Sequence, residues 1–113
     1  MSKKILYSCD TGVDDALALA YLAAQEECEV VGVTCSYGMS YVGDVFRNTK
    51  EVLRLCGKPE IPIVMGSETP LSGEHIDFSG GSKFHGMSGI GGVLPPSTPE
   101  DWGDAKPRIL LLR

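Results

Sequence analysis

The sequence predicts an α/β fold with an open, mainly parallel sheet and flanking helices. Three short apolar runs alternate with two segments of helical character along the first 65 residues. Strands that are apolar along their whole length are typical of parallel sheets. A β-α-β-α-β order is also the order of right-handed crossover units. The 113 residues are enough for one such domain, and we treat residues 1–113 as one unit.

The first two predicted elements are a buried strand and a helix. Residues 5–7 form a short apolar run between polar neighbours, which indicates a buried strand. Residues 14–25 are rich in Ala and Leu and contain neither Gly nor Pro, which favours a helix. Because this helix is apolar nearly all round, we expect it to lie between two layers.

The next elements repeat this order. Residues 29–37 are apolar and β-branched, which predicts a second buried strand. Apolar side chains then recur at helical spacing from Val42 to Cys56, and Gly57 is expected to end this helix. Residues 61–65 predict a third strand.

Residues 66–106 differ in composition from the rest of the chain. They hold most of the glycines and show little periodicity, which predicts a long active-site loop that covers a substrate. Residues 109–112 predict a fourth strand directly before the last residue. Since no helix follows to cover that strand, either another chain completes the sheet or the sequence is a piece of a longer protein.

Composition and charge exclude several functional classes. The formal net charge of −5 argues against a nucleic-acid binder, which needs clustered Lys and Arg. No apolar run is long enough to span a membrane, and the N-terminus does not resemble a signal peptide. The four cysteines form no C-x-x-C pair and are expected to be buried free thiols, which favours a reducing, cytoplasmic location.

An acidic loop follows the first predicted strand. Asp10, Asp14 and Asp15 place three carboxylates within six residues, and Gly12 would permit the loop to turn back. Helix capping and the helix dipole account for one or two of them. The third indicates a hard cation such as calcium, which prefers oxygen ligands, or a sugar. Local chemistry leaves capping and ligand binding open.

The acidic loop and the segments after it resemble the inosine–uridine-preferring nucleoside hydrolases. The likeness begins with CDTGVDDALALAYLA and continues through VVGVTCSYG, RNTKEVLRLCGKPEIPIVMGSETPL and FHGMSGIGG in the family's order. This resemblance implies a Rossmann-like nucleoside hydrolase fold, here apparently truncated. It also implies hydrolysis of the N-glycosidic bond of nucleosides, with a calcium-bound water, to give ribose and free base.

The resemblance implies a role for five residues. Asp10 matches the calcium ligand that takes a proton from the bound water, and Asp15 matches a bidentate calcium ligand. Asp14 matches a residue that binds a ribose hydroxyl, and Met39 stands where the family has a ribose-binding Asn. His85 lies in the family's His-Gly loop near the substrate, although a lone loop histidine is also commonly solvated.

Departures from the family leave a second reading open. Besides Met39, Ser8 replaces an Asp of the loop and Ser88 replaces a common acid. Family members are more than twice as long, and their remaining part supplies further calcium ligands and a second histidine. The alternative is therefore a non-catalytic or truncated subunit that binds or assembles. The expected partners are a nucleoside and either further copies of the chain or a missing C-terminal half.

Four other features of the sequence carry expectations. Cys9 is expected to be a buried thiol behind the acidic loop, and His75 a surface residue. Trp102 either anchors the long loop or meets a partner. The paired glycines fit no phosphate-binding pattern, which excludes nucleotide phosphates.

Overall fold

A computed structural model describes residues 3–74, 77–78, 83–86 and 88–105. Its elements follow the predicted order, with a short 3₁₀ helix added near the end of the described chain. They are β1 (Lys3–Cys9), α1 (Val13–Ala24), β2 (Cys28–Cys35), α2 (Val42–Leu55), β3 (Ile63–Met65) and η1 (Pro99–Trp102).

The three strands form one parallel sheet in the order β1-β2-β3. Cys9 at the end of β1 lies opposite Cys35 at the end of β2, and Cys35 lies opposite Met65 at the end of β3. The carboxyl ends of all three strands therefore meet at one edge, where open parallel sheets bind their ligands. This arrangement confirms the predicted α/β class.

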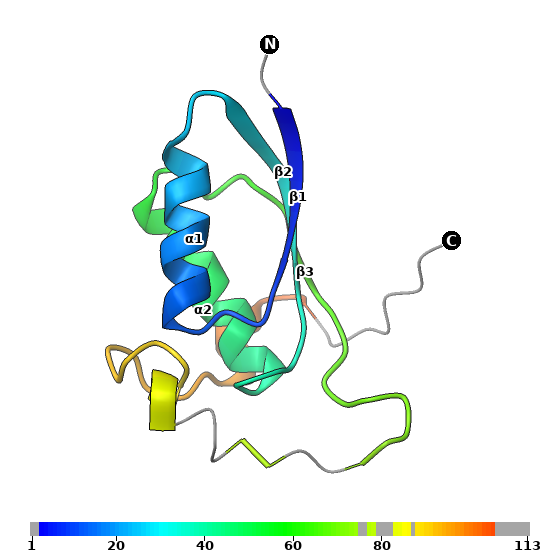
Figure 1. The fold of residues 1–113 in the computed structure, drawn as a ribbon. Coiled ribbons are helices and arrows are strands. Elements are labelled where there is room, and N and C mark those ends of the chain that lie inside the picture. Colours follow the sequence, from blue (N-terminus) through cyan, green and yellow to red (C-terminus); the bar gives the residue numbers. More distant parts are fainter. Residues whose placement is uncertain (1–2, 75–76, 79–82, 87, 106–113) are drawn as a thin grey trace.

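Both helices cover the same face of the sheet (Figure 1). Each strand pairs with the next one in sequence, so two right-handed crossovers in the same direction place α1 and α2 on one side. Among the described residues no helix lies on the other side, and the apolar side chains Leu6, Val31 and Val64 are exposed.

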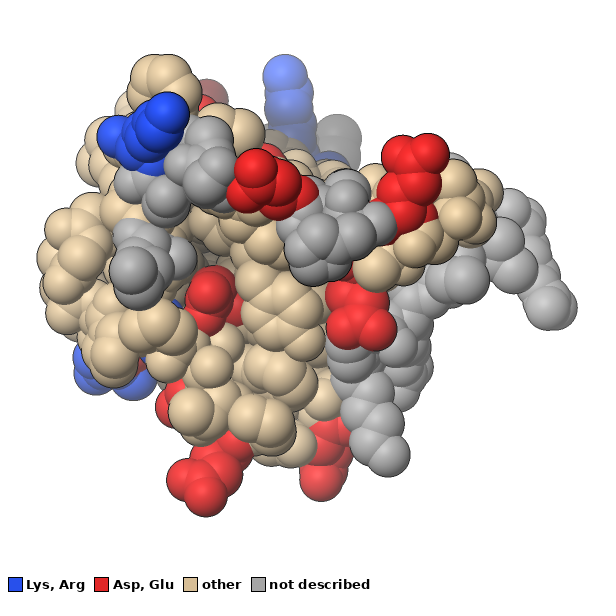
Figure 2. Space-filling view, turned by 90° about the horizontal axis from the view of Figure 1, so that it is seen from below, with Lys and Arg blue, Asp and Glu red and all other residues tan. Residues whose placement is uncertain are grey.

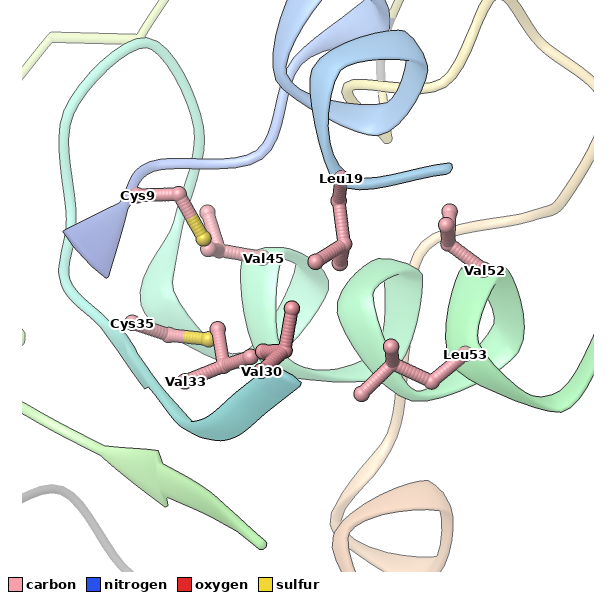
Figure 3. Packing of buried hydrophobic residues seen from close by; sticks show 8 residues of the cluster. All are labelled: Cys9, Leu19, Val30, Val33, Cys35, Val45, Val52 and Leu53. Carbon is pink, nitrogen blue, oxygen red and sulfur yellow. The ribbon is translucent and has the colours of Figure 1, made fainter. Parts of the chain in front are cut away.

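The core lies between the sheet and the two helices (Figure 3). Strand residues such as Val33 and Cys35 meet Leu19 of α1 and Val45 and Leu53 of α2. As predicted, Gly57 follows the end of α2. Its φ of +73° is a conformation that glycine adopts without steric strain. There the amides of Gly57 and Lys58 donate to the carbonyls of Arg54 and Leu53, a Schellman end.

Some burial predictions are wrong. The helix α1 was expected between two layers, but only Leu19 is fully buried, and Leu17 is 69% exposed. The strand β1 was expected to be buried, but Leu6 is 67% exposed. The physical reason is that the described chain covers only the inner side of each element. Of the cysteines, Cys28 and Cys56 are half-buried, while Cys9 and Cys35 are buried.

All four cysteines are free, as the sequence predicts. The predicted strand at residues 109–112 and the predicted surface residue His75 lie outside the described residues. None of the helices described is both long and apolar enough to cross a lipid bilayer.

Replacing Leu53 with Ala should destabilise the chain by about 3 kcal/mol, because the change leaves a cavity in the core. Leu53 is 1% exposed. The matched control on the same helix is Leu55→Ala, which should cost about 0.5 kcal/mol because Leu55 is 74% exposed. Urea unfolding followed by circular dichroism measures both, and equal losses would contradict this account of the core.

Candidate functional site

Asp10 follows β1 and Asp15 lies in the first turn of α1, and their carboxyl groups share a hydrogen bond. Burial and the nearby carboxylate of Asp10 raise the pKa of Asp15 to about 6. Burial acts in the same direction on Asp10, but hydrogen bonds from Asp15 and from the Met39 backbone outweigh it and lower the pKa of Asp10. The pair therefore shares one proton, which stays on Asp15 well above the usual titration range of an aspartate.

The loop after β2 lies directly against Asp10. The backbone N–H of Met39 donates to Asp10 Oδ2 over 3.1 Å. A side chain at Gly38 would overlap the Asp10 carboxylate, so glycine is needed there for the close approach. The amide of Ser36 also donates to the carbonyl of Cys9, which continues the pairing of the two strands into the loops.

His85 reaches the same edge from the glycine-rich region. Its Nδ1 accepts a hydrogen bond of 3.1 Å from the backbone N–H of Val13, the first residue of α1. Its Nε2 lies 3.9 Å from Oδ1 of Asp14, whose side chain is 79% exposed. This distance is too long for a hydrogen bond, so the carboxylate of Asp14 stays open to a ligand.

Gly12 has a different task from the predicted one. We expected it to let the acidic loop turn back, but its φ of −94° and ψ of −166° are open to any residue. A Cβ at Gly12 would lie only 2.7 Å from the His85 ring. Glycine is therefore needed for the close approach of His85.

A network of buried hydroxyl and thiol groups connects the acidic loop to α2. The Thr11 hydroxyl lies 2.7 Å from that of Thr49 on α2, and Thr49 in turn donates to the Val45 carbonyl. Cys9 Sγ lies 3.0 Å from the Thr11 hydroxyl, and Cys35 donates to Thr49. Sequence reasoning missed both threonines. The only local signal was a hydroxyl within an otherwise apolar helix face.

All five residues singled out by the sequence lie at the carboxyl edge. They are Asp10, Asp14, Asp15, Met39 and His85. Within the described ranges, no three His, Cys, Asp or Glu side chains come together as a ready metal site. Figure 2 views this edge along the strands and shows acidic side chains across it, with basic ones at its margins.

Three other singled-out residues take part in packing and in internal hydrogen bonds. Ser88 is buried, and its hydroxyl donates to the carbonyl of Leu94. Cys9 is a buried thiol, as expected. Trp102 anchors the long region: its ring packs on Gly43 of α2 and lies at a tilt to Tyr41.

The shared proton predicts a pH dependence of stability. Because the pKa of Asp15 is about 6 in the folded chain and 3.8 ordinarily, its protonation favours folding at low pH. That contribution is lost as the pH rises through about 6. Because Asp15 is only partly buried, solvent screens its interactions, and we expect a loss of about 1 kcal/mol between pH 4.5 and 7.5.

The variant Asp15→Asn should not show this loss, since an amide donates to Asp10 at every pH. Urea unfolding of both proteins at pH 4.5 and 7.5 measures the difference. The lowered pKa of Asp10 acts below this window, so it does not interfere. Parallel pH profiles for the two proteins would contradict the shared proton.

Comparison with known proteins gives a consistent result. Residues 5–110 match the model of the family described as inosine-uridine preferring nucleoside hydrolase. The chain is 38% identical over 100 residues to a pyrimidine-specific ribonucleoside hydrolase of Klebsiella pneumoniae, which covers 88% of this chain and 30% of that protein.

Solved structures agree. A purine-preferring ribonucleoside hydrolase from Gardnerella vaginalis matches 86% of this chain with a TM-score of 0.76 and 33% identity, over 31% of its own length. A plant nucleoside hydrolase matches 84% with a TM-score of 0.75 and 30% identity, over 30% of its length. The chain thus spans about a third of these relatives. On the family match and these similarities, the chain belongs to the inosine-uridine preferring nucleoside hydrolase family.

Proposed function

We propose that this chain forms the cation-binding and ribose-facing part of a site that hydrolyses the N-glycosidic bond of ribonucleosides. The observation that carries the proposal is the pairing of Asp10 and Asp15 at the carboxyl edge, beside Asp14 and His85, in a member of this family. One named relative is pyrimidine-specific and another purine-preferring. The family therefore accommodates both base classes, and we assign neither.

The carboxyl pair suits a hard cation. Two carboxylates that already share a proton repel each other when both ionise, and a divalent cation in place of the proton would offset that repulsion. Asp10 and Asp15 would hold calcium, which takes six to eight oxygen ligands in all. Water and parts of the fold outside this chain would supply the others. When bound, calcium would lower the pKa of a water molecule and hold it in place.

The side chains of this chain have distinct tasks in the proposed reaction. As the bond from C1′ to the base breaks, the sugar would pass through an oxocarbenium-like transition state, as in other glycoside hydrolysis. Asp10 would accept a proton from the water that attacks C1′. The base would leave with the bonding electron pair and take up a proton, supplied by water or by a group outside this chain. The exposed carboxylate of Asp14 would accept a hydrogen bond from a ribose hydroxyl and hold the ring for attack. His85 would border the substrate beside it.

A second candidate function is a non-catalytic or truncated nucleoside hydrolase-like subunit that binds or assembles. Met39 favours it, because its thioether cannot replace the hydrogen bonds of an Asn. The face of the sheet that the described residues leave exposed also favours assembly, with a second copy or with a chain that supplies the rest of the fold. Calcium-dependent turnover by the purified chain, alone or with that complement, separates the two functions.

We expect release of ribose from a nucleoside panel to require calcium and to stop in EDTA. The assay is run on the purified chain and again with the complementary part of a relative added. The variant Asp10→Asn should lower kcat at least about 100-fold, because it removes the proton acceptor. Asp104→Asn, a change at an exposed position beyond η1, is the matched control. Undiminished release in EDTA, or by Asp10→Asn, would argue against this mechanism.

Replacing Met39 with Asn should tighten nucleoside binding about fivefold, by one added hydrogen bond to ribose. Its backbone N–H bond to Asp10 does not involve the side chain, so that contact should remain. Isothermal titration with a nucleoside and with the free base measures the effect. Met39→Leu is the control that changes shape without adding a donor. A gain that appears for the free base as well would mean that the new side chain does not contact ribose.

A further inference from the structure

The helix α2 has a buried polar face turned toward the glycine-rich region. Asp44, Arg47 and Asn48 are all buried, which is uncommon for such residues. Each side chain bonds the backbone of residues 88–97, which we call the clasped loop. Asn48 Nδ2 donates to the carbonyl of Ser88 over 2.7 Å. Arg47 Nη2 donates to the carbonyl of Pro95, also over 2.7 Å.

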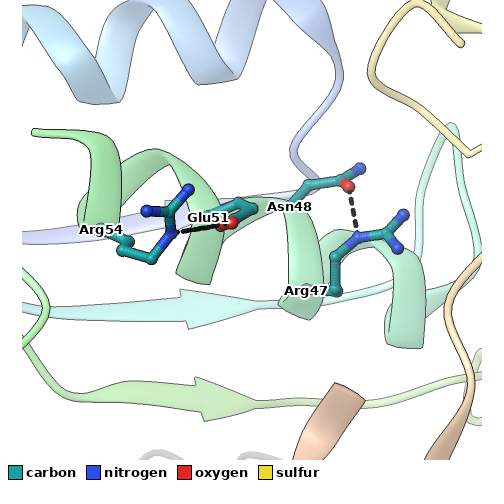
Figure 4. A network of polar contacts seen from close by, with 4 residues as sticks. All are labelled: Arg47, Asn48, Glu51 and Arg54. Atoms are coloured by element: carbon teal, nitrogen blue, oxygen red, sulfur yellow. Dashed lines mark hydrogen bonds and ion pairs between the residues drawn. The ribbon is translucent and has the colours of Figure 1, made fainter. Parts of the chain in front are cut away.

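Further bonds join these contacts into one network. Arg47 Nε donates to Oδ1 of Asn48 over 3.1 Å, so the guanidinium also orients the amide (Figure 4). The amide of Ser97 donates to Oδ1 of Asp44 over 2.6 Å. Within the described chain, no buried side-chain nitrogen or oxygen lacks a partner. The cost of burying these groups is therefore offset only while the clasped loop stays in place.

The clasped loop is connected to His85 by short backbone bonds. The amide of Gly91 donates to the carbonyl of His85 over 2.6 Å, and the amide of Gly89 to the carbonyl of Gly86. Gly89 also packs against Asn48 and the Ser40 hydroxyl, where a side chain would not fit. The position of the His85 backbone is thus set by the residues that α2 holds.

His85 in turn has one defined hydrogen-bond state. Its Nδ1 accepts the N–H of Val13, an amide at the helix N-terminus that has no partner within the helix. A nitrogen that accepts carries no proton, so the proton of the neutral ring lies on Nε2. That N–H lies on the side of Asp14. The ring therefore offers a donor beside the proposed ribose-binding carboxylate.

We propose that Arg47 and Asn48 are positioning residues for His85. By holding the clasped loop, they keep Nδ1 of the imidazole on the N-terminus of α1 and present Nε2–H beside Asp14. The consequence for a nucleoside rests on the proposed function, but the positioning of the ring does not. Neither residue contacts the carboxyl group of Asp10 or Asp15, and both act through the loop.

The test follows the His85 ring in the free chain by nitrogen NMR at a pH where the imidazole is neutral. His75→Gln removes the only other histidine, so the remaining signals belong to His85. We expect the Nε2–H tautomer to dominate. The variants are Arg47→Ala and Asn48→Asp, of which the second keeps the side-chain shape but cannot donate to Ser88. In both, the chemical shifts of the two ring nitrogens should approach the values of a mixture of the two tautomers. Exchange of the Val13 amide should become at least about tenfold faster.

The matched control is Arg54→Ala on the same helix, where the exposed guanidinium pairs with Glu51 (Figure 4). It should leave the ring signals unchanged. Arg47→Lys retains the charge but reaches fewer acceptors, so the Nε2–H tautomer should be more populated than in Arg47→Ala. Amides of β1 and β2 report whether each variant is folded. If Arg47→Ala destroys the fold, Arg47→Lys and Asn48→Asp still give the comparison.

Unchanged ring signals in folded Asn48→Asp would overturn the proposal, as would a parent chain without the Nε2–H tautomer. All these readings are made without nucleoside or calcium. A chain that shows the expected shifts but never binds a nucleoside would therefore refute the proposed function alone. A chain that binds nucleoside with equal affinity in all variants but shows no shifts would refute the positioning role alone.

Discussion

Parallel pairing of β1 with β2 is the constraint on which the candidate site depends. The register that sets Cys9 opposite Cys35 makes both strands end at the same height. The acidic loop and the loop at residues 36–40 therefore leave the sheet side by side. Asp10 can then accept the Met39 amide, and this bond helps to keep Asp10 ionised while its neighbour Asp15 holds the shared proton. A slip of one residue would turn these side chains to the opposite face.

Two glycines permit the close contacts between these loops and the functional side chains. Gly38 leaves room for the Asp10 carboxylate, and Gly12 leaves room for the ring of His85. In neither case is left-handed backbone involved, since both residues lack a positive φ. Their contribution is space, and a methyl group at either position would push a functional side chain away. The geometry of the site thus depends on the absence of a side chain at Gly12 and Gly38 as well as on the functional side chains.

The sequence predicts local features well and distant contacts poorly. The elements β1 to β3 follow from apolar runs, and the acidic loop from three carboxylates next to one another. The contact of His85 with Val13 joins residues 72 positions apart, and no periodicity reveals it. Arg47 and Asn48 look like ordinary polar helix positions until their partners are placed. The burial of α1 and β1 is overestimated because an apolar pattern shows which faces of an element are able to pack against a partner. It does not show whether the described chain contains a partner for each face.

The sequential strand order has a consequence for how the site forms. Each of the three described strands pairs with its neighbour in sequence, so this sheet and both helices can assemble from short loops at low entropic cost. Asp10, Asp14 and Asp15 all lie between the end of β1 and the first turn of α1. The histidine can arrive only after the longest closure, when the region beyond β3 has folded back onto α2. The two halves of the site therefore differ in the length of chain that must be ordered to form them: the acidic half needs only neighbouring elements, whereas the histidine needs a contact over 72 positions.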